Sequence, residues 1–287
     1  MKLLEERMIG GHISTSGGIW KAPERASVFG FRTFQIFSKN QMQWKASELK
    51  ETDIQAFRSG MEKYGMSKTM VHASYLLNLG TSDPQLEAKV RLSLQEEIRR
   101  SDLLGTDYLT IHPGSSSGSS EEAGIRNVYE NINSVFHEGI KTTILLETAA
   151  GQGKTLGSNF QQIAEMIDGI IYRAGIGVCF DTCHVFASGY DIKSENGYME
   201  TMDQFNSIIG LNRLRGFHLN DSKKEKGSRL DRHEQIGRGM LGIDGVKNFI
   251  NDPRFRDVPM ILETPKGEEG YMEDIMEMER VYGRFSQ

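Results

Sequence analysis

One stretch decides the fold: residues 143–181, which read TILLETAAGQGKTLGSNFQQIAEMIDGIIYRAGIGVCFD. An apolar, β-prone run opens it and ends in Glu147, and a second such run closes it and ends in Asp181. Between them lie a glycine-containing loop and a helical segment that begins near Ser158, with apolar residues at helical spacing. A strand, a helix and a strand in this order predict one βαβ unit of a parallel sheet.

The same alternation continues along the whole chain. We expect eight strands, at 8–14, 33–37, 69–73, 108–112, 143–147, 176–181, 216–219 and 259–263. Helix signals lie between them, as where Asp83 and Pro84 open a helix that Gly105 ends. No linker or change in composition divides the chain, and the Ser/Gly-rich piece at 114–120 is short enough for one loop. The pattern predicts a single α/β domain over residues 1–287, a closed (β/α)8 TIM barrel.

The composition is that of a folded globular protein, with 38% hydrophobic and 25% charged residues. Acidic residues at 1–7 argue against a signal peptide, and no run of about 18 apolar residues follows that could cross a membrane. Cys179 and Cys183 do not form a CxxC motif, so we expect buried free thiols. We therefore expect a cytoplasmic protein. Its net charge of −5 argues against nucleic-acid binding through overall basicity.

Side chains that can bind metals close six of the expected strands. They are His72, His112, Glu147, Asp181, His218 and Glu263. The C-terminal strand ends of a barrel gather on one face, where active sites of this fold lie. A lone histidine at a strand end is usually a hydrogen-bonded structural residue, but six such residues around one axis favour a site. Lys or Arg could neutralise the carboxylates, whereas metal ions suit the histidines as well.

Two further clusters add ligands. His184 follows Asp181 across a turn, and Asp231 and His233 lie two residues apart, so that on an extended segment both side chains point the same way. The alternative for His233 is a surface position in a charged loop. Five histidines and four carboxylates exceed what one tetrahedral zinc takes and suit two or three ions. Three divalent ions bring about +6 against about −4 from the carboxylates, so the site would attract a phosphodiester.

A competing motif follows the fifth expected strand. Gly151-Gln-Gly-Lys-Thr155 resembles the end of a P-loop, and 177–181 could serve as its magnesium-binding strand. The motif GxxxxGK[ST] needs glycine at position 148, where Thr148 stands. We therefore disfavour a P-loop NTPase and expect the glycines to form a tight loop close to the substrate.

Ordered sequence blocks run through nearly the whole chain: MIGGH (8–12), FSKNQ (37–41), HASYLLNLG (72–80), HPG (112–114), LETAAGQG (146–153), FDTCH (180–184), GYD (189–191), HLNDSK (218–223), GSRLDRH (227–233) and LET (262–264). These blocks resemble endonuclease IV, the metal-dependent apurinic/apyrimidinic endonuclease family. The resemblance implies a TIM barrel with three Zn²⁺ ions at the C-terminal strand ends. Mn²⁺ or Fe²⁺ could replace zinc, because histidine and carboxylate accept these ions too.

The resemblance also divides the ligands among the three ions. It implies that one ion is held by His72, His112 and Glu147, that Glu147 bridges to a second completed by Asp181, His218 and Glu263, and that a third is held by His184, Asp231 and His233. Glu147 and Glu263 are the implied catalytic residues. His12 is implied to orient the site from behind the ligands rather than to bind an ion.

The implied activity is hydrolysis of the phosphodiester 5′ to an abasic site in duplex DNA. A metal-activated water attacks the phosphorus and leaves a 3′-hydroxyl and a 5′-deoxyribose phosphate. Blocked 3′ ends would be trimmed by the same chemistry. Double-stranded DNA with abasic sites is the expected partner, with no membrane and no obligate protein partner, and the chain is expected to be a monomer.

The resemblance implies DNA contacts on several loops. Tyr75 and Leu76 would enter the minor groove beside a flipped-out abasic nucleotide, with plain loop packing as the alternative. The other implied DNA-binding residues are Asn40, Gln43, Lys223 and Arg229, the last two within a basic strip that also holds Lys224 and Lys226. A solvated charged loop is the alternative for this strip. Met42 stands where close relatives often carry arginine, so we expect a steric role for it alone.

Two other functions remain open from the residues. A metal-dependent sugar isomerase also places carboxylates and histidines at barrel strand ends, but it predicts a smaller, closed pocket without Asp231 and His233. A non-catalytic DNA-binding protein would lose no chemistry on chelation, and nine intact ligands argue against it.

Overall fold

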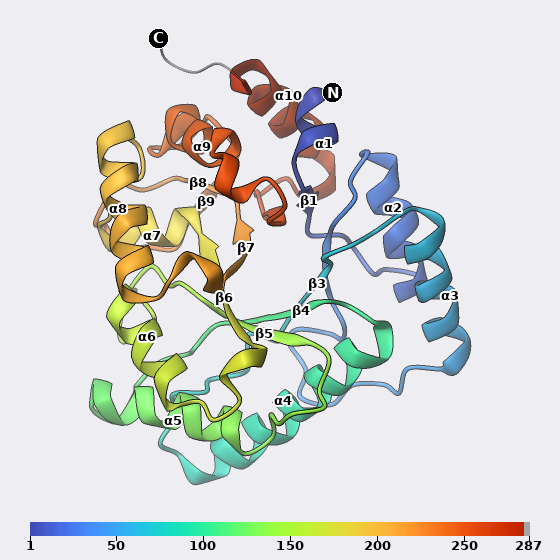
Figure 1. Ribbon diagram of the computed structural model, residues 1–287. Helices are drawn as coiled ribbons and strands as arrows, with labels where there is room; N and C mark the ends of the chain where they lie inside the picture. The colour runs from blue at the N-terminus through green and yellow to red at the C-terminus, as the bar shows by residue number, and fades with distance from the viewer. Residues whose placement is uncertain (284–287) are drawn as a thin grey trace.

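Parallel strands form a ring in the computed structural model, which describes residues 1–283 (Figure 1). The strands are β1 (Ile9–Gly11), β2 (Gln35–Phe37), β3 (Met70–His72), β4 (Tyr108–Ile111), β5 (Thr143–Glu147), β6 (Ile176–Asp181), β7 (Leu214–His218) and β10 (Met260–Leu262). They form one eight-stranded sheet in the order β1-β10-β7-β6-β5-β4-β3-β2. Its two edges meet where His12 bridges Gln35, and the Ile13 N–H donates to the Gln35 carbonyl at 2.8 Å. The predicted TIM barrel is confirmed.

Several strands are shorter than predicted or shifted. β1 spans three residues rather than the expected 8–14, and β7 begins at Leu214, before the expected 216. The approach of β1 to β2 depends on Gly10, because a Cβ there would lie 2.4 Å from the Thr33 carbonyl oxygen.

Helices surround the ring (Figure 1). They are α1 (Lys2–Glu6), α2 (Ala22–Val28), α3 (Glu51–Lys63), α4 (Pro84–Leu104), α5 (Glu121–Asn133), α6 (Phe160–Gly169), α7 (Thr182–Ser188), α8 (Glu195–Ile208), α9 (Gly242–Asn251) and α10 (Tyr271–Val281). The signals predicted for α4 are confirmed, since Asp83 caps it by accepting from the Gln85 N–H and Gly105 ends it with φ 74°. A membrane crossing would need a longer, more apolar helix than any within residues 1–283.

The apolar core has two parts. Met70, Leu145, Cys179 and Ile261 fill the inside of the ring and are fully buried. A larger core lies between the strands and the helices. Both cysteines are free and buried, as predicted. The packed interior supports the strand ends rigidly, which positions the side chains that follow.

A short hairpin that the sequence did not predict follows β7. Its strands β8 (Asp221–Ser222) and β9 (His233–Glu234) pair antiparallel. The buried carboxylate of Asp221 anchors it by accepting from the Gly239 N–H at 2.9 Å and the Gly242 N–H at 3.0 Å. The hairpin brings the basic loop and Asp231 to the mouth of the barrel.

Candidate metal centre

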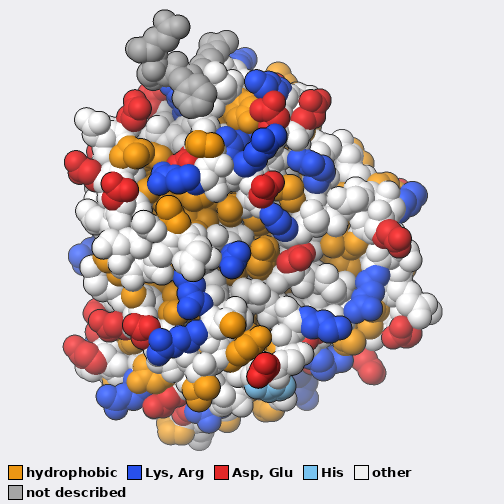
Figure 2. Space-filling model, in the orientation of Figure 1, with side chains coloured by type: hydrophobic (Ala, Val, Ile, Leu, Met, Phe, Trp, Pro, Cys, Tyr) orange, Lys and Arg blue, Asp and Glu red, His pale blue; other side chains and the backbone are white. Residues whose placement is uncertain are grey.

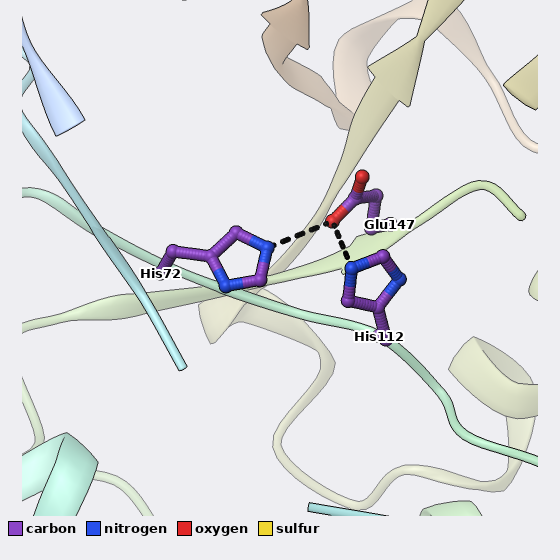
Figure 3. Close-up of side chains that lie close together, drawn as sticks. All are labelled: His72, His112 and Glu147. Atoms are coloured by element: carbon purple, nitrogen blue, oxygen red, sulfur yellow. Dashed lines mark ion pairs between the residues drawn. The ribbon is translucent and has the colours of Figure 1, made fainter. Parts of the chain in front are cut away.

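The nine predicted ligands meet at one end of the barrel, where four groups of side chains have donor atoms within 4.8 Å of one another. Three of the groups contain all nine ligands: His72, His112 and Glu147; Glu147, Asp181, His218 and Glu263; and His184, Asp231 and His233. The fourth group joins Asp181 and His233 to the thiol of Cys183. Glu147 belongs to two of them and stands between them. Figure 3 shows the rings of His72 and His112 pointing at the same oxygen of Glu147.

The separations within the groups are those of ligands that share an ion. Two ligands at 2.0–2.1 Å from a tetrahedral zinc are about 3.3 Å apart. The Nε2 atoms of His72 and His112 each lie 3.4 Å from Glu147 Oε2. Asp231 lies 3.1 Å from His184 Nε2 and 3.4 Å from His233 Nε2. In the remaining group, His218 Nδ1 lies 3.3 Å from Glu263 Oε2.

The histidine rings are held by one nitrogen, which leaves the other free. The Nδ1 atoms of His72, His184 and His233 donate to the carbonyl oxygens of Ala73 at 2.7 Å, Thr148 at 2.8 Å and Glu263 at 3.2 Å. Each Nε2 then carries a lone pair and faces the carboxylates. Within residues 1–283, Glu147 Oε2, His184 Nε2 and His233 Nε2 are buried without a hydrogen-bond partner. This pattern fits metal ligands whose outer nitrogen is fixed by a carbonyl.

The sequence did not show whether Lys, Arg or metal ions neutralise the four carboxylates. Among the described residues, every ion-pair partner of Glu147, Asp181, Asp231 and Glu263 is a histidine. A histidine that binds a metal ion is neutral, and a neutral imidazole does not offset a carboxylate. Because no Lys or Arg among residues 1–283 forms an ion pair with them, these four buried or half-buried acids can accept metal cations.

The electrostatics of the cluster keep the acids charged. Burial alone would raise the pKa of Glu147, but the imidazoles of His112 and His218 outweigh it and hold this pKa well below its ordinary value. The pKa of Asp231 falls to about 2, because its interaction with the His184 imidazole, 3.1 Å away, outweighs burial. Conversely, burial lowers the pKa of His184, but Asp181 and Asp231 raise it well above 6.5. Ionised carboxylates are the form that binds cations.

Two amide side chains that the sequence analysis missed support the ligands. Gln35 accepts a hydrogen bond from His218 Nε2 at 2.8 Å and donates to Glu263 Oε1 at 2.6 Å. This orientation turns His218 Nδ1 toward the carboxylates. Asn220 donates to Asp181 Oδ2 at 2.8 Å and accepts from the Glu263 N–H at 2.9 Å. The signal for Gln35 was a polar residue inside an apolar strand segment.

His12 lies behind Glu263, outside the three ligand groups. Its Nδ1 is 3.5 Å from Glu263 Oε1 and accepts from the Gln35 amide at 3.1 Å. Burial lowers the pKa of His12 in spite of the neighbouring Glu263. The role of His12 in orienting a ligand stays a prediction.

Tyr75 stands beside the metal centre with more than half of its surface exposed, 57%. Its ring centroid lies 5.3 Å from that of His72 and 6.0 Å from that of His112. Burial, followed by the charges of Glu263 and Glu147, raises the pKa of Tyr75, so its hydroxyl stays protonated. Leu76 is half-buried. The phenol ring of Tyr75 thus packs against the rings of His72 and His112, and its exposed part is accessible to a large partner.

The neighbouring loop presents Met42, which is 67% exposed. The side chain of Asn40 accepts from the Met42 N–H at 2.9 Å, so it shapes this turn, and Gln43 is exposed beside it. The structure thus brings Met42 to a loop tip. Asn40 already has a structural partner there, which the sequence did not predict.

The basic strip lies on the other side of the mouth, in the loop between β8 and β9, with Lys223, Lys224, Lys226 and Arg229 exposed. Arg229 has φ 55°, a backbone conformation that is uncommon outside glycine, and its N–H donates to the Ala187 carbonyl at 2.8 Å. It lines a cavity of about 300 Å³ with Ser188 and Tyr190. On the face drawn in Figure 2, basic and acidic side chains are interspersed.

The glycine loop does not form a P-loop. Gly151 and Gly153 adopt φ 83° and 65°, but α6 begins only at Phe160 rather than directly after Thr155. A P-loop leads straight into its helix, so that interpretation is wrong. The loop instead contributes Gln152 and Thr155 to a cavity of about 290 Å³ beside His112, His184 and Asp231.

Known proteins resemble this chain over nearly its whole length. Residues 23–281 match the family model described as a xylose isomerase-like TIM barrel. A Thermoplasma volcanium protein named probable endonuclease 4 is 46% identical over 275 residues, which cover 96% of this chain and 95% of that protein. The crystal structure of endonuclease IV from Thermus thermophilus is similar with a TM-score of 0.85 and 32% identity, covering 96% of this chain and 98% of that one.

Sugar enzymes share the architecture alone. A D-tagatose 3-epimerase-like protein has a TM-score of 0.71 over 95% of this chain and 96% of its own, at only 16% identity. Identity at that level supports a common barrel and not a common substrate. The sugar-isomerase alternative is therefore supported by the fold only, whereas the resemblance to endonuclease IV is supported by both the fold and the sequence.

Proposed function

The chain belongs to the endonuclease IV family of hydrolases that act on DNA, and on that premise we propose that it cuts the phosphodiester 5′ to abasic sites in duplex DNA. The products are a 3′-hydroxyl and a 5′-deoxyribose phosphate. The observation that carries the proposal is the mouth of the barrel, where four carboxylates pair with histidines at the spacing of shared metal ligands. Blocked 3′ ends present the same bond and are a second substrate.

We assign three divalent ions to this mouth, with zinc as the first choice and manganese or iron as alternatives. His72, His112 and Glu147 would hold one; Glu147, Asp181, His218 and Glu263 the second; and His184, Asp231 and His233 the third. When bound, the ions supply Lewis acidity and lower the pKa of water. They also supply positive charge where an acidic protein must accept a phosphodiester.

The catalytic carboxylates are Glu147 and Glu263. Burial raises the pKa of Glu263, but His218 and His12 outweigh it and hold the pKa far below its ordinary value. Both carboxylates therefore stay ionised at neutral pH, and they would orient the attacking water by accepting its hydrogen bonds rather than act as acids. Gln35 holds Glu263 Oε1, which leaves Oε2 toward His218 and the centre of the mouth.

DNA lies across the mouth in this proposal. Met42, Tyr75 and Leu76 enter the minor groove, with Asn40 and Gln43 beside them. Lys223 and Arg229 contact phosphates from the basic strip. The whole chain, residues 1–287, acts as one domain and as a monomer in the cytoplasm, without an obligate protein partner.

The deciding experiment uses a duplex with one tetrahydrofuran abasic analogue, incubated with metal-replete protein. The analogue cannot undergo β-elimination, so incision means hydrolysis. We expect a single cut 5′ to the analogue, with a 3′-hydroxyl that a polymerase extends. The same duplex with thymine at that position is the control and stays intact.

Two outcomes oppose the proposal. Protein that carries its metals, by elemental analysis, and leaves the analogue uncut is not an abasic endonuclease. Ketose interconversion by the same preparation would revive the sugar-isomerase alternative.

A further inference from the structure

A second group of buried charges lies away from the metal centre, on one face of α4. Glu97 is 1% exposed and Arg100 4% exposed, and both face the loops that follow β2 and β3. The side chain of Lys39, from the first of these loops, is 2% exposed and lies 3.6 Å from Glu97 Oε1. Removing three charged groups from water costs free energy, so packing alone does not explain why these residues are buried.

The carboxylate of Glu97 joins the two loops. Its Oε2 accepts from the Ser38 hydroxyl at 2.9 Å, in the first loop, residues 38–50. Its Oε1 accepts from the Ser74 N–H at 3.1 Å, in the second loop, residues 73–82. The loops also touch directly, since the Ser74 hydroxyl donates to the Gln41 carbonyl at 2.6 Å. One acid thus sets the spacing between two segments of irregular backbone.

The two cations hold the first loop along its length. Arg100 donates to the carbonyl of Ser38 at 3.1 Å and to that of Ser47 at 2.8 Å. Lys39 donates to Ser93 on α4 at 2.8 Å and to the carbonyls of Gln43 and Trp44, each at 3.4 Å. Carbonyls of this loop, which has no regular structure, therefore accept from two cations, one on α4 and one in the loop itself.

The loops so joined carry the exposed side chains beside the metal centre. Met42 lies in the first loop and Tyr75, which immediately follows Ser74, in the second. Both are more than half exposed although their neighbours are tied down. A satisfied buried network rigidifies what it joins, which lowers the entropy lost when the loops bind.

We propose that Glu97, with Lys39 and Arg100, is a clamp that positions the Met42 and Tyr75 loops for joint entry into damaged DNA. Glu97 is a positioning residue, since it reaches DNA only through the loops. The inference rests on the proposed function. It assigns a role to charges that the metal centre does not use.

The test compares three variants. Glu97→Gln removes the charge and keeps the shape. Ser74→Ala removes the hydroxyl between the loops, leaves Glu97 in place, and serves if Glu97→Gln fails to fold. Glu87→Gln is the matched control, because its carboxylate pairs with Arg91 on the same helix. KM and kcat are measured on the tetrahydrofuran duplex, together with bound metal.

We expect KM to rise about tenfold for Glu97→Gln and about threefold for Ser74→Ala, as for the loss of charge-assisted and ordinary hydrogen bonds. The value of kcat and the metal content should stay within about twofold. Glu87→Gln should match the parent. Unchanged KM in both test variants overturns the clamp, as does a fall in kcat together with metal loss, which would make the network a support of the metal centre.

A separate readout follows the loop without any substrate. Trp20 and Trp44 are the two tryptophans of the chain, so Trp20→Phe leaves Trp44 as a probe in the first loop. In this background, Glu97→Gln should increase acrylamide quenching of Trp44, and unchanged quenching contradicts the clamp. If the parent does not incise the duplex, the proposed function fails, while quenching still decides whether Glu97 restrains the loop.

Discussion

Buried carboxylates have different kinds of partner at the two ends of the barrel. At the N-terminal strand ends, Asp252 precedes β10 and pairs with Arg254 at 2.6 Å. It also accepts from the Tyr198 hydroxyl at 2.6 Å, and Arg7 donates to its carbonyl at 2.6 Å. At the mouth, the four carboxylates have histidines as their ion-pair partners within the described chain, and Glu147 Oε2 has no hydrogen bond.

This difference between the two ends indicates which end binds a ligand. The charge and hydrogen bonds of Asp252 are satisfied by Arg254 and Tyr198, so the N-terminal end of the barrel needs no bound ion. The four carboxylates at the mouth, whose neighbours are imidazoles, have their charge balanced only when metal cations bind. The two ends of the barrel differ in the partners of their buried carboxylates rather than in the number of charges. Substitutions or metal removal can test this difference at either end.

Removal of the metal ions should have the largest effect. Dialysis against a chelator is expected to abolish incision of the tetrahydrofuran duplex, because the proposed chemistry depends on the ions. The far-ultraviolet circular dichroism should persist, since the core lies below the mouth. Thermal stability should fall with loss of the ligand contribution. Added zinc should restore both properties, and full activity of metal-free protein would contradict the centre.

Glu147→Gln should come next, with kcat lowered roughly 10³-fold, because it removes the charge shared by two ligand groups from a buried site. Gln has nearly the same shape, so folding should survive. Single-turnover incision measures the effect, with elemental analysis to count the ions retained. A rate close to that of the parent would falsify the bridging role.

Gln35→Ala tests the support behind the ligands. Loss of its bonds to His218 and Glu263 should weaken metal retention roughly 10–100-fold, as for other groups that orient ligands. Competition with a fluorescent zinc chelator measures this. Gln55→Ala, which loses a bond to Glu51 on the surface of α3, is the control and should retain metal normally. Equal retention in both variants would make Gln35 a packing residue.

Asp252→Asn should leave incision unchanged and lower the free energy of unfolding by about 2 kcal/mol at neutral pH, since it weakens hydrogen bonds to a charged group. Burial raises the pKa of Asp252, but Arg254 and Tyr198 outweigh it and lower the pKa below its ordinary value. Stability from such an acid is present above its ordinary pKa and is lost as the pH falls through the lowered one.

The stability difference between parent and Asp252→Asn should therefore shrink below about pH 4. Urea unfolding across a pH series measures it. A difference that stays constant into the acid range would show that the carboxylate charge contributes nothing at this end.

Much of the site followed from the sequence. Parallel strands all end on one face, so a polar residue at the end of an apolar run, such as His72 or Glu147, must lie at the mouth. Strand boundaries were less predictable: β1 covers only Ile9–Gly11 of the apolar run, because its length depends on the neighbouring strands with which it pairs. The hairpin β8/β9 was missed because strands of two residues leave no periodicity to detect.

The sequence by itself determined the barrel and the nine donor residues, because local periodicity and strand direction suffice for both. Spacing left open which donors share a group, although the family resemblance implied a division, and the folded chain alone shows which ring nitrogen each histidine turns toward the carboxylates. His218 depends for this on Gln35, 183 residues away. Glu97 likewise joins segments 59 and 23 residues distant. Such contacts depend on how the ring closes and packs, and local sequence carries no record of that.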